Sequence, residues 1–595
     1  MNDPVCQTVC EMVKQYAPSD WQEHCIALLK DLLGGNTRYQ REIIVLAFAL
    51  SDGAVSELQQ QTRQQIPPEI VVKRLAQRLH TDRGLDRDLA RWAMDVWAKA
   101  LVAYEPSNWQ QNRADSEIIT VSSSGSGQYA TIDEALQNAR PGDTILVKPG
   151  SYTETITITQ PVEIVGDGAV EQIVISTNGA PCLRMQTDTA VVRGLTLQTQ
   201  AGKERQKLSA VEISRGRLEL TDCQITSECG PGIAISGPAT NPTIQRCTLV
   251  QCKEGGLLIS EQAQGNIERC TIRNNDRAGI IITQKSHPTL RNCTISGNRT
   301  VGILIYDHGQ GQILQCDISA NAAAAVEIRQ GGNPLIQSCT LHKETGKGIL
   351  VWEHGQGRIE DCDIANNALA GIEIRTGGNP VVRNCKIHDS KWSGLLIWEH
   401  GRGTIETCDI FNNTLAEVEI RQGGDPLLKN CTLHSGKGRG LLVHEQGRGH
   451  IESCDIFDMA QAGVEIRQQG DPFLQSCKIH DMWRIGVQIM DEGRGTLKQC
   501  EIARNPIVGI NIKQGGHPLL QYCSIHDSRG IGVCSAARGQ GKLIDCDLFQ
   551  LAGPAIEIKP GGKLDLQQCR LHHNGQDIMI HDGGYVTKDG MVLTN

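Results

Sequence analysis

Aromatic residues are scarce in this chain of 595 residues, where Trp, Tyr and Phe together make up 4% of the sequence. Such a composition argues against a globular core built on large rings and favours a turn-rich stacked sheet, as do the 63 glycines. An excess of basic residues is also lacking. The formal net charge of −9 excludes the electrostatic footprint of a nucleic-acid-binding protein or of one that binds an anionic membrane surface. No stretch approaches about 18 consecutive apolar residues, so no membrane-spanning helix is predicted.

Cysteine, in contrast, returns every 23 residues through most of the chain. A fixed period of this length, with short strand patterns and turn residues in each unit, predicts a solenoid whose coils stack along one axis. The regular series contains fifteen cysteines and no insertion: Cys247, Cys270, Cys293, Cys316, Cys339, Cys362, Cys385, Cys408, Cys431, Cys454, Cys477, Cys500, Cys523, Cys546 and Cys569.

These cysteines are expected to be free thiols. Stacked coils would bring them about 4.8 Å apart, a spacing that a disulfide accepts. However, residues Met1 to Lys14 do not resemble a secretion signal, so we expect a cytoplasmic, reducing location. A cysteine at the inner corner of every coil would also be buried.

Residues 1–105 carry the pattern of a helical bundle. The segment with Trp92 and Trp97 resembles the end of a small helical module found beside varied effector domains in bacterial regulatory proteins, although core tryptophans of a bundle explain it equally well. Cys6 and Cys10 lack a second pair at metal-ligand spacing, so no zinc site is predicted. Apolar residues recur at helical spacing in five segments: Val5 to Tyr16, Trp21 to Leu33, Arg38 to Leu50, Pro67 to Leu79 and Leu85 to Leu101.

The start of the β region follows a polar stretch, residues 106–117, which is predicted to be a linker. Its motifs are Gly127-Gln128-Tyr129-Ala130-Thr131-Ile132-Asp133-Glu134-Ala135-Leu136, then Pro141-Gly142-Asp143-Thr144 and Pro149-Gly150-Ser151-Tyr152. Together with the 23-residue coils, these motifs resemble right-handed parallel β-helix proteins of the pectin-lyase-like superfamily, in which a short helix covers the first coil.

The resemblance implies a mainly β chain, a right-handed parallel β-helix preceded by a small all-α domain. We expect an N-terminal cap with irregular coils over 118–246, regular coils over 247–582 and a C-terminal cap or tail over 583–595. It leaves the function open, because the superfamily includes lyases, hydrolases, epimerases, adhesins and binding modules.

Each regular coil is predicted to contain three short strands around an apolar interior. Counted from the cysteine, apolar residues fall at positions +2, +10, +12 and +20, as in Ile387, Leu395, Ile397 and Ile405 after Cys385. Position +5 is often asparagine, whose amide is expected to bond to the next coil as a ladder. These asparagines are Asn275, Asn298, Asn321, Asn367, Asn413 and Asn505.

From Cys316 onward two kinds of coil alternate, so the true repeat is 46 residues. The strings Gly371-Ile372-Glu373-Ile374-Arg375 and Gly394-Leu395-Leu396-Ile397-Trp398 represent the two kinds. Arginines and aromatic residues thereby alternate in one outward column, each about 5 Å from the next, with glutamates on the same face. The column contains Arg329, Trp352, Arg375, Trp398, Arg421, His444 and Arg467, and the glutamates are Glu327, Glu373, Glu419 and Glu465.

Two further outward columns follow the cysteines. Residues directly after them alternate in charge, as in Asp363, Lys386 and Asp409, an arrangement expected to avoid repulsion between coils and to fix their register. Beside them runs a histidine column that we interpret as solvent-side rings stacked on phenylalanines, rather than as a metal site. It contains His342, His388, His434, His480, His526 and His572, with Phe411, Phe457 and Phe549 between.

The candidate binding face combines the arginine and aromatic column with the Trp-Glu-His-Gly turns. No catalytic residue, metal ligand or cofactor site is predicted. The candidate residues are Glu327, Arg329, Trp352, Glu353, His354, Glu373, Arg375, Trp398, Glu399, His400, Glu419, Arg421 and His444.

Three functions remain open on these residues. Enzymes on this fold concentrate catalytic groups in one irregular patch, whereas the polar columns here extend over at least five coils. Asp425-Pro426 and Asp471-Pro472 are not followed by the histidine of epimerase-like sequences.

We therefore favour a non-catalytic scaffold that presents this face to a protein or oligosaccharide, with the helical head as a second docking module and neither nucleic acid nor membrane as partner. It resembles β-helix domains that serve as substrate receptors beside F-box motifs, although no F-box is recognisable. The alternatives are a polysaccharide lyase or glycoside hydrolase, and a purely structural spacer.

Overall fold

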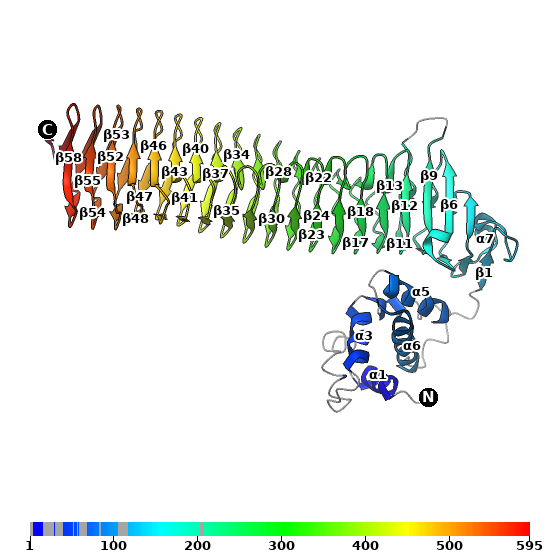
Figure 1. The fold of residues 1–595 in the computed structure, drawn as a ribbon. Coiled ribbons are helices and arrows are strands. Elements are labelled where there is room, and N and C mark those ends of the chain that lie inside the picture. Colours follow the sequence, from blue (N-terminus) through cyan, green and yellow to red (C-terminus); the bar gives the residue numbers. More distant parts are fainter. Residues whose placement is uncertain are drawn as a thin grey trace. The chain divides into compact units, whose positions relative to one another are not determined.

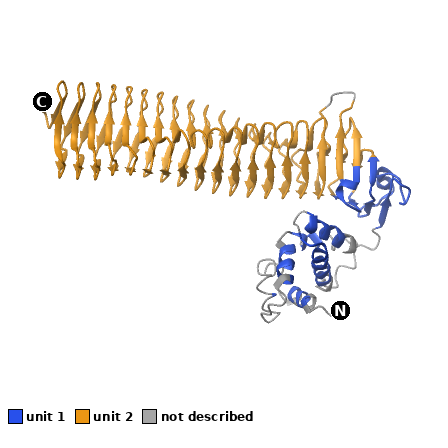
Figure 2. Ribbon diagram, viewed as in Figure 1, with its two compact units in different colours: residues 1–152, 161–174, 193–195 blue, residues 153–160, 175–192, 196–595 orange. Residues whose placement is uncertain are grey.

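The computed structural model describes residues 4–15, 29, 40–51, 53–55, 57–58, 68–81, 85–104, 117–202 and 207–594. They divide into two compact units (Figure 2). Unit 1 comprises residues 1–152, 161–174 and 193–195, and unit 2 comprises residues 153–160, 175–192 and 196–595. Except for Glu117, the predicted linker lies outside the described residues, as does the predicted helix from Trp21 to Leu33 except for Leu29.

Four helices of unit 1 coincide with predicted ones: α1 (Pro4–Gln15), α3 (Gln40–Ser51), α5 (Pro68–Thr81) and α6 (Arg87–Tyr104). Trp97 is fully buried in their core, and its Nε1 donates a hydrogen bond to the backbone oxygen of Leu46 at 3.2 Å. Trp92 packs against the same core, so the interpretation of both tryptophans as core residues is confirmed. None of the described helices is long and apolar enough to cross a membrane.

A short helix, α7 (Ile132–Asn138), lies against the first strands of unit 1, β1 (Ile118–Val121) and β2 (Thr144–Val147). Thr131 caps it, because its hydroxyl accepts a hydrogen bond from the backbone N–H of Glu134 at 3.2 Å. Ile132, Ala135 and Leu136 are buried beneath it. The helix at the start of the β-helix is the one that the resemblance implies.

Unit 2 is a stack of coils, and its strands form three parallel sheets, here named A, B and C (Figure 1). In one coil, β33 (Lys386–His388) belongs to sheet B, β34 (Leu395–Ile397) to sheet C and β35 (Thr404–Glu406) to sheet A. Leu395 pairs with Ile372 on one side and Val418 on the other, a separation of 23 residues in each direction. The predicted three-stranded coil and its period are confirmed.

The strands of the 46-residue repeat are short and begin and end at corresponding positions in each coil. Those of sheet C are β25 (Ala324–Ile328), β28 (Lys347–Val351), β31 (Ile372–Ile374), β37 (Ala416–Ile420), β40 (Arg439–Val443) and β43 (Ala462–Ile466). Those of sheet B are β24 (Asp317–Ser319), β27 (Thr340–His342), β30 (Asp363–Ala365), β36 (Asp409–Phe411), β39 (Thr432–His434), β42 (Asp455–Phe457) and β45 (Lys478–His480). Those of sheet A are β26 (Leu335–Gln337), β29 (Arg358–Glu360), β32 (Val381–Arg383), β38 (Leu427–Lys429) and β41 (His450–Glu452).

The cysteines occupy the inner corner between sheets A and B, as predicted. All fifteen of the regular series are buried free thiols. The Cys385 sulfur lies 3.5 Å from the backbone oxygen of Ile359 and 3.2 Å from that of Arg383, so each thiol can donate a weak hydrogen bond within the stack. Burial raises the pKa of the Cys247 thiol, so the buried sulfur stays protonated.

An asparagine ladder occupies the corner between sheets B and C. The Asn298 side-chain oxygen accepts hydrogen bonds from the backbone N–H of Asn275 at 3.1 Å and from its side chain at 2.9 Å, and Asn321 serves Asn298 in the same way. The predicted ladder is confirmed in these coils. It continues through Glu344, whose two carboxylate oxygens accept from Asn321 at 2.6 and 3.3 Å.

A second glutamate, Glu417, joins the ladder at a coil where the next ladder position is not asparagine. Glu417 stands at position +9, where glycine or alanine is usual, and accepts hydrogen bonds from the backbone and side chain of Asn413. On the next coil the ladder position is Gly436, where a Cβ would lie 2.5 Å from the Glu417 carboxylate. Glycine at this position therefore leaves the space that Glu417 fills.

Burial raises the pKa of Glu344 to about 8, and that of Glu417 to about 7, although hydrogen bonds from asparagine partly oppose the shift. Between the usual value of 4.5 and about 8, the folded state keeps the Glu344 proton and the unfolded chain loses it. The contribution of protonated Glu344 to stability is thus complete below pH 4.5 and is lost as the pH rises toward about 8.

Replacing Glu344 with glutamine should remove part of this pH dependence. Glu344→Gln keeps the acceptor oxygen and cannot ionise, so its stability relative to the wild type should rise with pH by about 1.4 kcal/mol for each pH unit over which the two states differ in protonation. Urea unfolding at a series of pH values measures the effect, with the exposed carboxyl variant Asp471→Asn as control. Parallel pH profiles for the wild type and Glu344→Gln would contradict the assignment.

Candidate functional site

The predicted arginine and aromatic column lies where the strands of sheet C end. Arg375 follows β31, and its guanidinium lies 4.8 Å from the Trp352 ring centroid and 5.4 Å from that of Trp398. Arg329 lies 5.6 Å from Trp352, and Arg421 lies 5.0 Å from Trp398. The predicted alternation is confirmed, and each tryptophan ring has a guanidinium on both faces.

The glutamates beside this column are less accessible than the sequence suggested. Glu373 and Glu419, two of the candidate binding residues, are only 5% and 3% exposed, so their neighbours largely cover them. The Trp398 indole N–H donates to Glu373 at 3.2 Å and that of Trp352 donates to Glu327 at 3.0 Å. In the following coil pair, the place of tryptophan is taken by His444, which is buried and lies 3.1 Å from Glu419.

Charge compensation completes the burial of these carboxylates. Lys347 reaches Glu373 at 3.3 Å, and the Ser393 hydroxyl donates to Glu419 at 2.7 Å. Burial by itself would raise the pKa of Glu419, but hydrogen bonds from His444 and Ser393 hold it below its usual value. The column is therefore saturated by its own members, and the two stacked tryptophans have no free face for a ligand.

The Trp-Glu-His-Gly turns lie outside this saturated column. Glu399 and His400 both have positive φ angles, 45° and 59°, and the Gly401 N–H closes the turn on the Trp398 oxygen at 2.8 Å, as in a type I′ turn. His354 and His400 are exposed. The carboxylates of Glu353 and Glu399 lie 3.8 and 3.6 Å from Arg329 and Arg375.

Each of these histidines lies over a glycine of the next coil. A Cβ at Gly377 would be 2.7 Å from His354 Nδ1, and one at Gly423 would be 2.6 Å from His400 Nδ1. From His354 to Gly423, histidine and glycine therefore alternate, which is a packing reason for the 46-residue period at this turn in these coils. Because the two Glu-His pairs have the same surroundings, neither is singled out as a catalytic site.

A polar groove of about 770 Å³ runs along the turns between sheets C and A, beside His400. Arg402 and Arg448 flank Asp425 on three successive coils, and Glu445 also lines the groove. Charges of both signs balance along it, so it has no preference for a strongly acidic or basic chain.

The two most exposed of the described tryptophans were not among the residues predicted from the sequence. Trp392 and Trp483 are 44% and 66% exposed, on turns between sheets B and C, and Trp483 donates its indole N–H to Asp458 at 2.8 Å. Leu369 and Ile507 are 40% and 46% exposed on turns of the same corner. The positions 46 residues before and after Trp392 are Gly346 and Gly438. This departure from the repeat was the sequence signal that could have indicated an exposed tryptophan here.

The histidine column on sheet B is stacked as predicted. His388, Phe411 and His434 have parallel rings with centroids 4.6 and 5.1 Å apart. The partners of these histidines were not predicted from the sequence. His388 Nε2 lies 2.9 Å from Asp363 and Nδ1 lies 2.6 Å from Asp389. The aspartates after the cysteines are thus bound mainly by histidines of the next coil.

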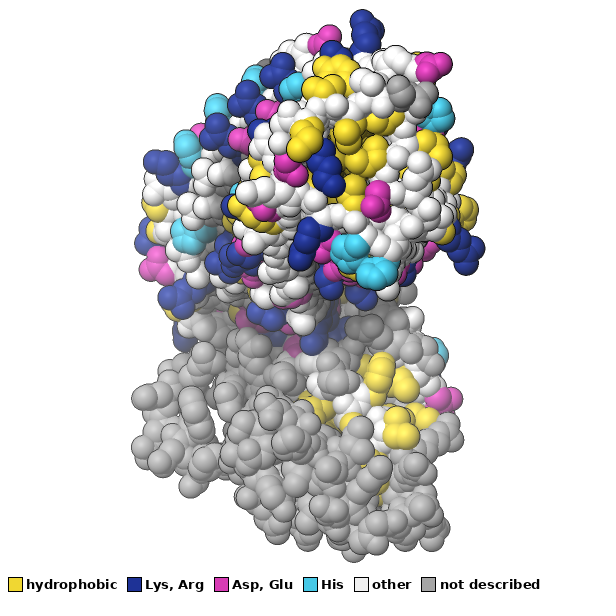
Figure 3. Space-filling model, turned by 90° about the vertical axis from the view of Figure 1, so that its left-hand side faces the viewer, with side chains coloured by type: hydrophobic (Ala, Val, Ile, Leu, Met, Phe, Trp, Pro, Cys, Tyr) yellow, Lys and Arg dark blue, Asp and Glu magenta, His cyan; other side chains and the backbone are white. Residues whose placement is uncertain are grey.

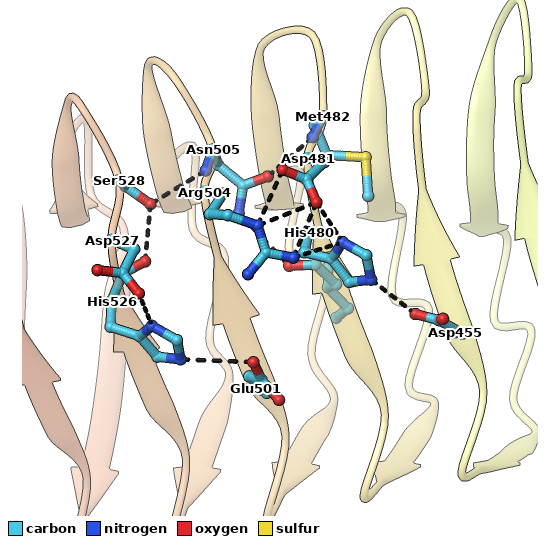
Figure 4. A network of polar contacts seen from close by, with 11 residues as sticks. Asp455, His480, Asp481, Met482, Glu501, Arg504, Asn505, His526, Asp527 and Ser528 are labelled. Carbon is cyan, nitrogen blue, oxygen red and sulfur yellow. Dashed lines mark hydrogen bonds and ion pairs between the residues drawn. The ribbon is translucent and has the colours of Figure 1, made fainter.

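Figure 4 shows this arrangement in later coils. His480 lies between Asp455 at 2.8 Å and Asp481 at 2.6 Å, and Arg504 also binds Asp481. Arg504 holds the pKa of the Asp481 carboxyl below its usual value. Among the residues that the structure describes, no group of three or more His, Cys, Asp or Glu side chains is arranged to hold a metal ion.

Comparison with known proteins identifies the repeat. The family model described as right handed beta helix region matches residues 209–357, 324–458 and 439–592. The chain belongs to this family. The right-handed parallel β-helix inferred from the sequence is thus confirmed.

Several solved structures are similar to this chain. The mannuronan C-5 epimerase A-module of Azotobacter vinelandii is 14% identical, with a TM-score of 0.38, over 53% of this chain and 91% of that one. The pectate lyase Pel9A is 12% identical, with a TM-score of 0.25, over 55% and 77%. The pectin methylesterase of Aspergillus niger is 16% identical, with a TM-score of 0.24, over 38% and 78%.

A structural role of the arginine and tryptophan column can be measured as stability. Arg375→Ala removes the cation between two indoles and one neighbour of buried Glu373, so we expect a loss of about 1–3 kcal/mol. Arg402→Ala, on an exposed position of a neighbouring turn, should change stability by less than about 0.5 kcal/mol. Equal changes in the free energy of unfolding for the two substitutions would show that the stacking does not stabilise the fold.

Proposed function

We propose that this protein is a non-catalytic interaction scaffold, with a protein partner bound along the corner between sheets B and C. The observation that carries the proposal is the exposure of Trp392 and Trp483 on that corner, whereas the other tryptophans that the structure describes stack on arginines or pack in the helical core. Tryptophan is enriched among residues that dominate the energy of protein interfaces. The arginine and tryptophan column then acts as the rigid support of this surface.

The neighbouring residues favour a protein over an oligosaccharide. Leu369 and Ile507 expose aliphatic side chains on the same corner, and such groups bury well against another protein. Trp392 and Trp483 belong to coils whose cysteines are four coils apart, a distance of about 19 Å along the stack. A partner must therefore be extended along several coils, and the helical head offers a second docking module.

An enzymatic role would need one set of groups that differs from its copies. The two Glu-His turns have equivalent contacts, and the histidines of sheet B are bound to carboxylates. This even distribution supports the scaffold rather than a lyase or hydrolase. The alternative function, a polysaccharide lyase or hydrolase, instead predicts that the protein releases product from acidic polysaccharides.

Site-specific photocrosslinking tests the scaffold. A photoreactive amino acid at Leu369 or Ile507 of the full chain should crosslink one discrete partner in the native cell. Trp392→Ala or Trp483→Ala should weaken that complex by about 2 kcal/mol, as expected for an interface hot spot. Tyr522→Ala, which removes a 55% exposed ring from another corner, should leave the crosslink unchanged.

Two outcomes would contradict the proposal. One is a crosslinking pattern that does not respond to either tryptophan substitution. The other is formation of unsaturated or reducing products when the purified chain is incubated with polygalacturonate or alginate.

A further inference from the structure

The last coil of unit 2 leaves its apolar interior partly open. It contains β57 (Arg570–His572) in sheet B and β58 (Gln576–Ile580) in sheet C. Leu571, Ile578 and Ile580 are only half-buried, whereas their partners one coil earlier, including Ile556 and Ile558, are 0% exposed. Figure 3 shows this end of the molecule, where hydrophobic side chains gather at the centre of the face and charged ones surround them.

The C-terminal segment covers one of the three sheet edges. β59 (Tyr585–Lys588) continues sheet A on β56 (Lys563–Gln567), and β60 (Met591–Leu593) turns back antiparallel to it. Val586 is buried by this hairpin, but Met591 and Val592 are 72% and 64% exposed. Among the described residues, β57 and β58 each pair with a strand on one side alone, β54 (Asp547–Phe549) and β55 (Pro554–Ile558).

We propose that a second copy of this chain docks on this face, so that two β-helices join at their C-terminal ends around a two-fold axis. Unpaired strand edges bind other strands readily, and neither β57 nor β58 contains a proline that would blunt its edge. A two-fold axis across the junction reverses strand direction, so each open edge would meet its partner antiparallel. The β59 and β60 hairpin already ends sheet A with an antiparallel strand.

The two ends of the β-helix differ, and this selects the symmetry. The first strands carry α7, whose Ile132, Ala135 and Leu136 are buried, and so they present a covered surface. A head-to-tail contact would need an open coil at both ends and would extend into a filament. Only a contact between like ends buries the open coil, and such a contact closes at two copies.

The charges around the face are compatible with its own copy. Arg570 and Lys588 are basic, whereas Asp577, Asp582 and Asp589 are acidic, so the rim carries both signs. A rim of mixed sign can meet its two-fold copy with opposite charges opposed, whereas a rim of one sign would repel it. The apolar centre supplies the area that such an interface buries.

Analytical ultracentrifugation of the full chain across a concentration series tests the dimer. The wild type should reach twice the chain mass and no more. Ile578→Lys places a charge in the open face and should give a monomer with unchanged circular dichroism. Tyr522→Lys places the same charge on an exposed position of a regular coil and should remain dimeric.

Hydrogen exchange on the wild type provides a test that does not depend on a substitution. Amides of β57 and β58 should exchange several-fold more slowly at high than at low protein concentration, while those of β54 and β55 should not change. A wild type that stays monomeric at all concentrations would overturn the proposal. So would a dimer that survives Ile578→Lys with unprotected β58 amides, or species that grow beyond two copies.

Discussion

Parallel stacking places every side chain against its own counterpart one coil away, and the rest of the structure depends on what that neighbour tolerates. Neutral groups can repeat every 23 residues, as the buried cysteines and the asparagine ladder do. Charged groups cannot, because like charges about 4.8 Å apart repel strongly in a partly buried column. Arginine therefore alternates with tryptophan, and histidine with phenylalanine or glycine.

The same constraint separates structural residues from candidates for function. Residues that recur every 46 positions, such as Arg375 and Glu373, contact side chains of the neighbouring coils. Their polar groups therefore stabilise the stack rather than face a ligand. Trp392 and Trp483 do not recur, and among the described tryptophans they are the two with large exposed surface. In this β-helix, recognition is therefore expected where the repeat is broken, including the last coil, where the stack ends.

The sequence predicted the coil well because its determinants are local and repeated. Cys385, Ile387 and Leu395 each appear many times in one register, so their inward direction could be derived from spacing alone. Burial in the outward columns could not be derived in this way. Glu373 faces outward in the strand pattern, yet a tryptophan and a lysine from neighbouring coils cover it.

The aspartate and histidine contacts were missed for a related reason. Position +1 and position +3 of neighbouring coils meet diagonally, so Asp363 binds His388 rather than its direct neighbour in the column. Glu417 shows the same limit, since its inward carboxylate is acceptable only because Gly436 leaves space on the next coil. These contacts depend on the length of each side chain and on its distance from residues at other positions of the neighbouring coil. The spacing of the repeat alone contains neither kind of information.

Deletion of whole coils tests the doubled repeat most directly. Removing residues 371–416 deletes one coil of each kind and leaves Trp352 beside Arg421, whereas removing residues 394–416 deletes one coil and places Arg375 beside Arg421 and Glu373 beside Glu419. Both deletions share the junction at Glu417. Urea unfolding should show the longer deletion close to the wild type in stability and the shorter one clearly less stable. Equal stability of the two, or a lower stability of the longer deletion, would contradict the account.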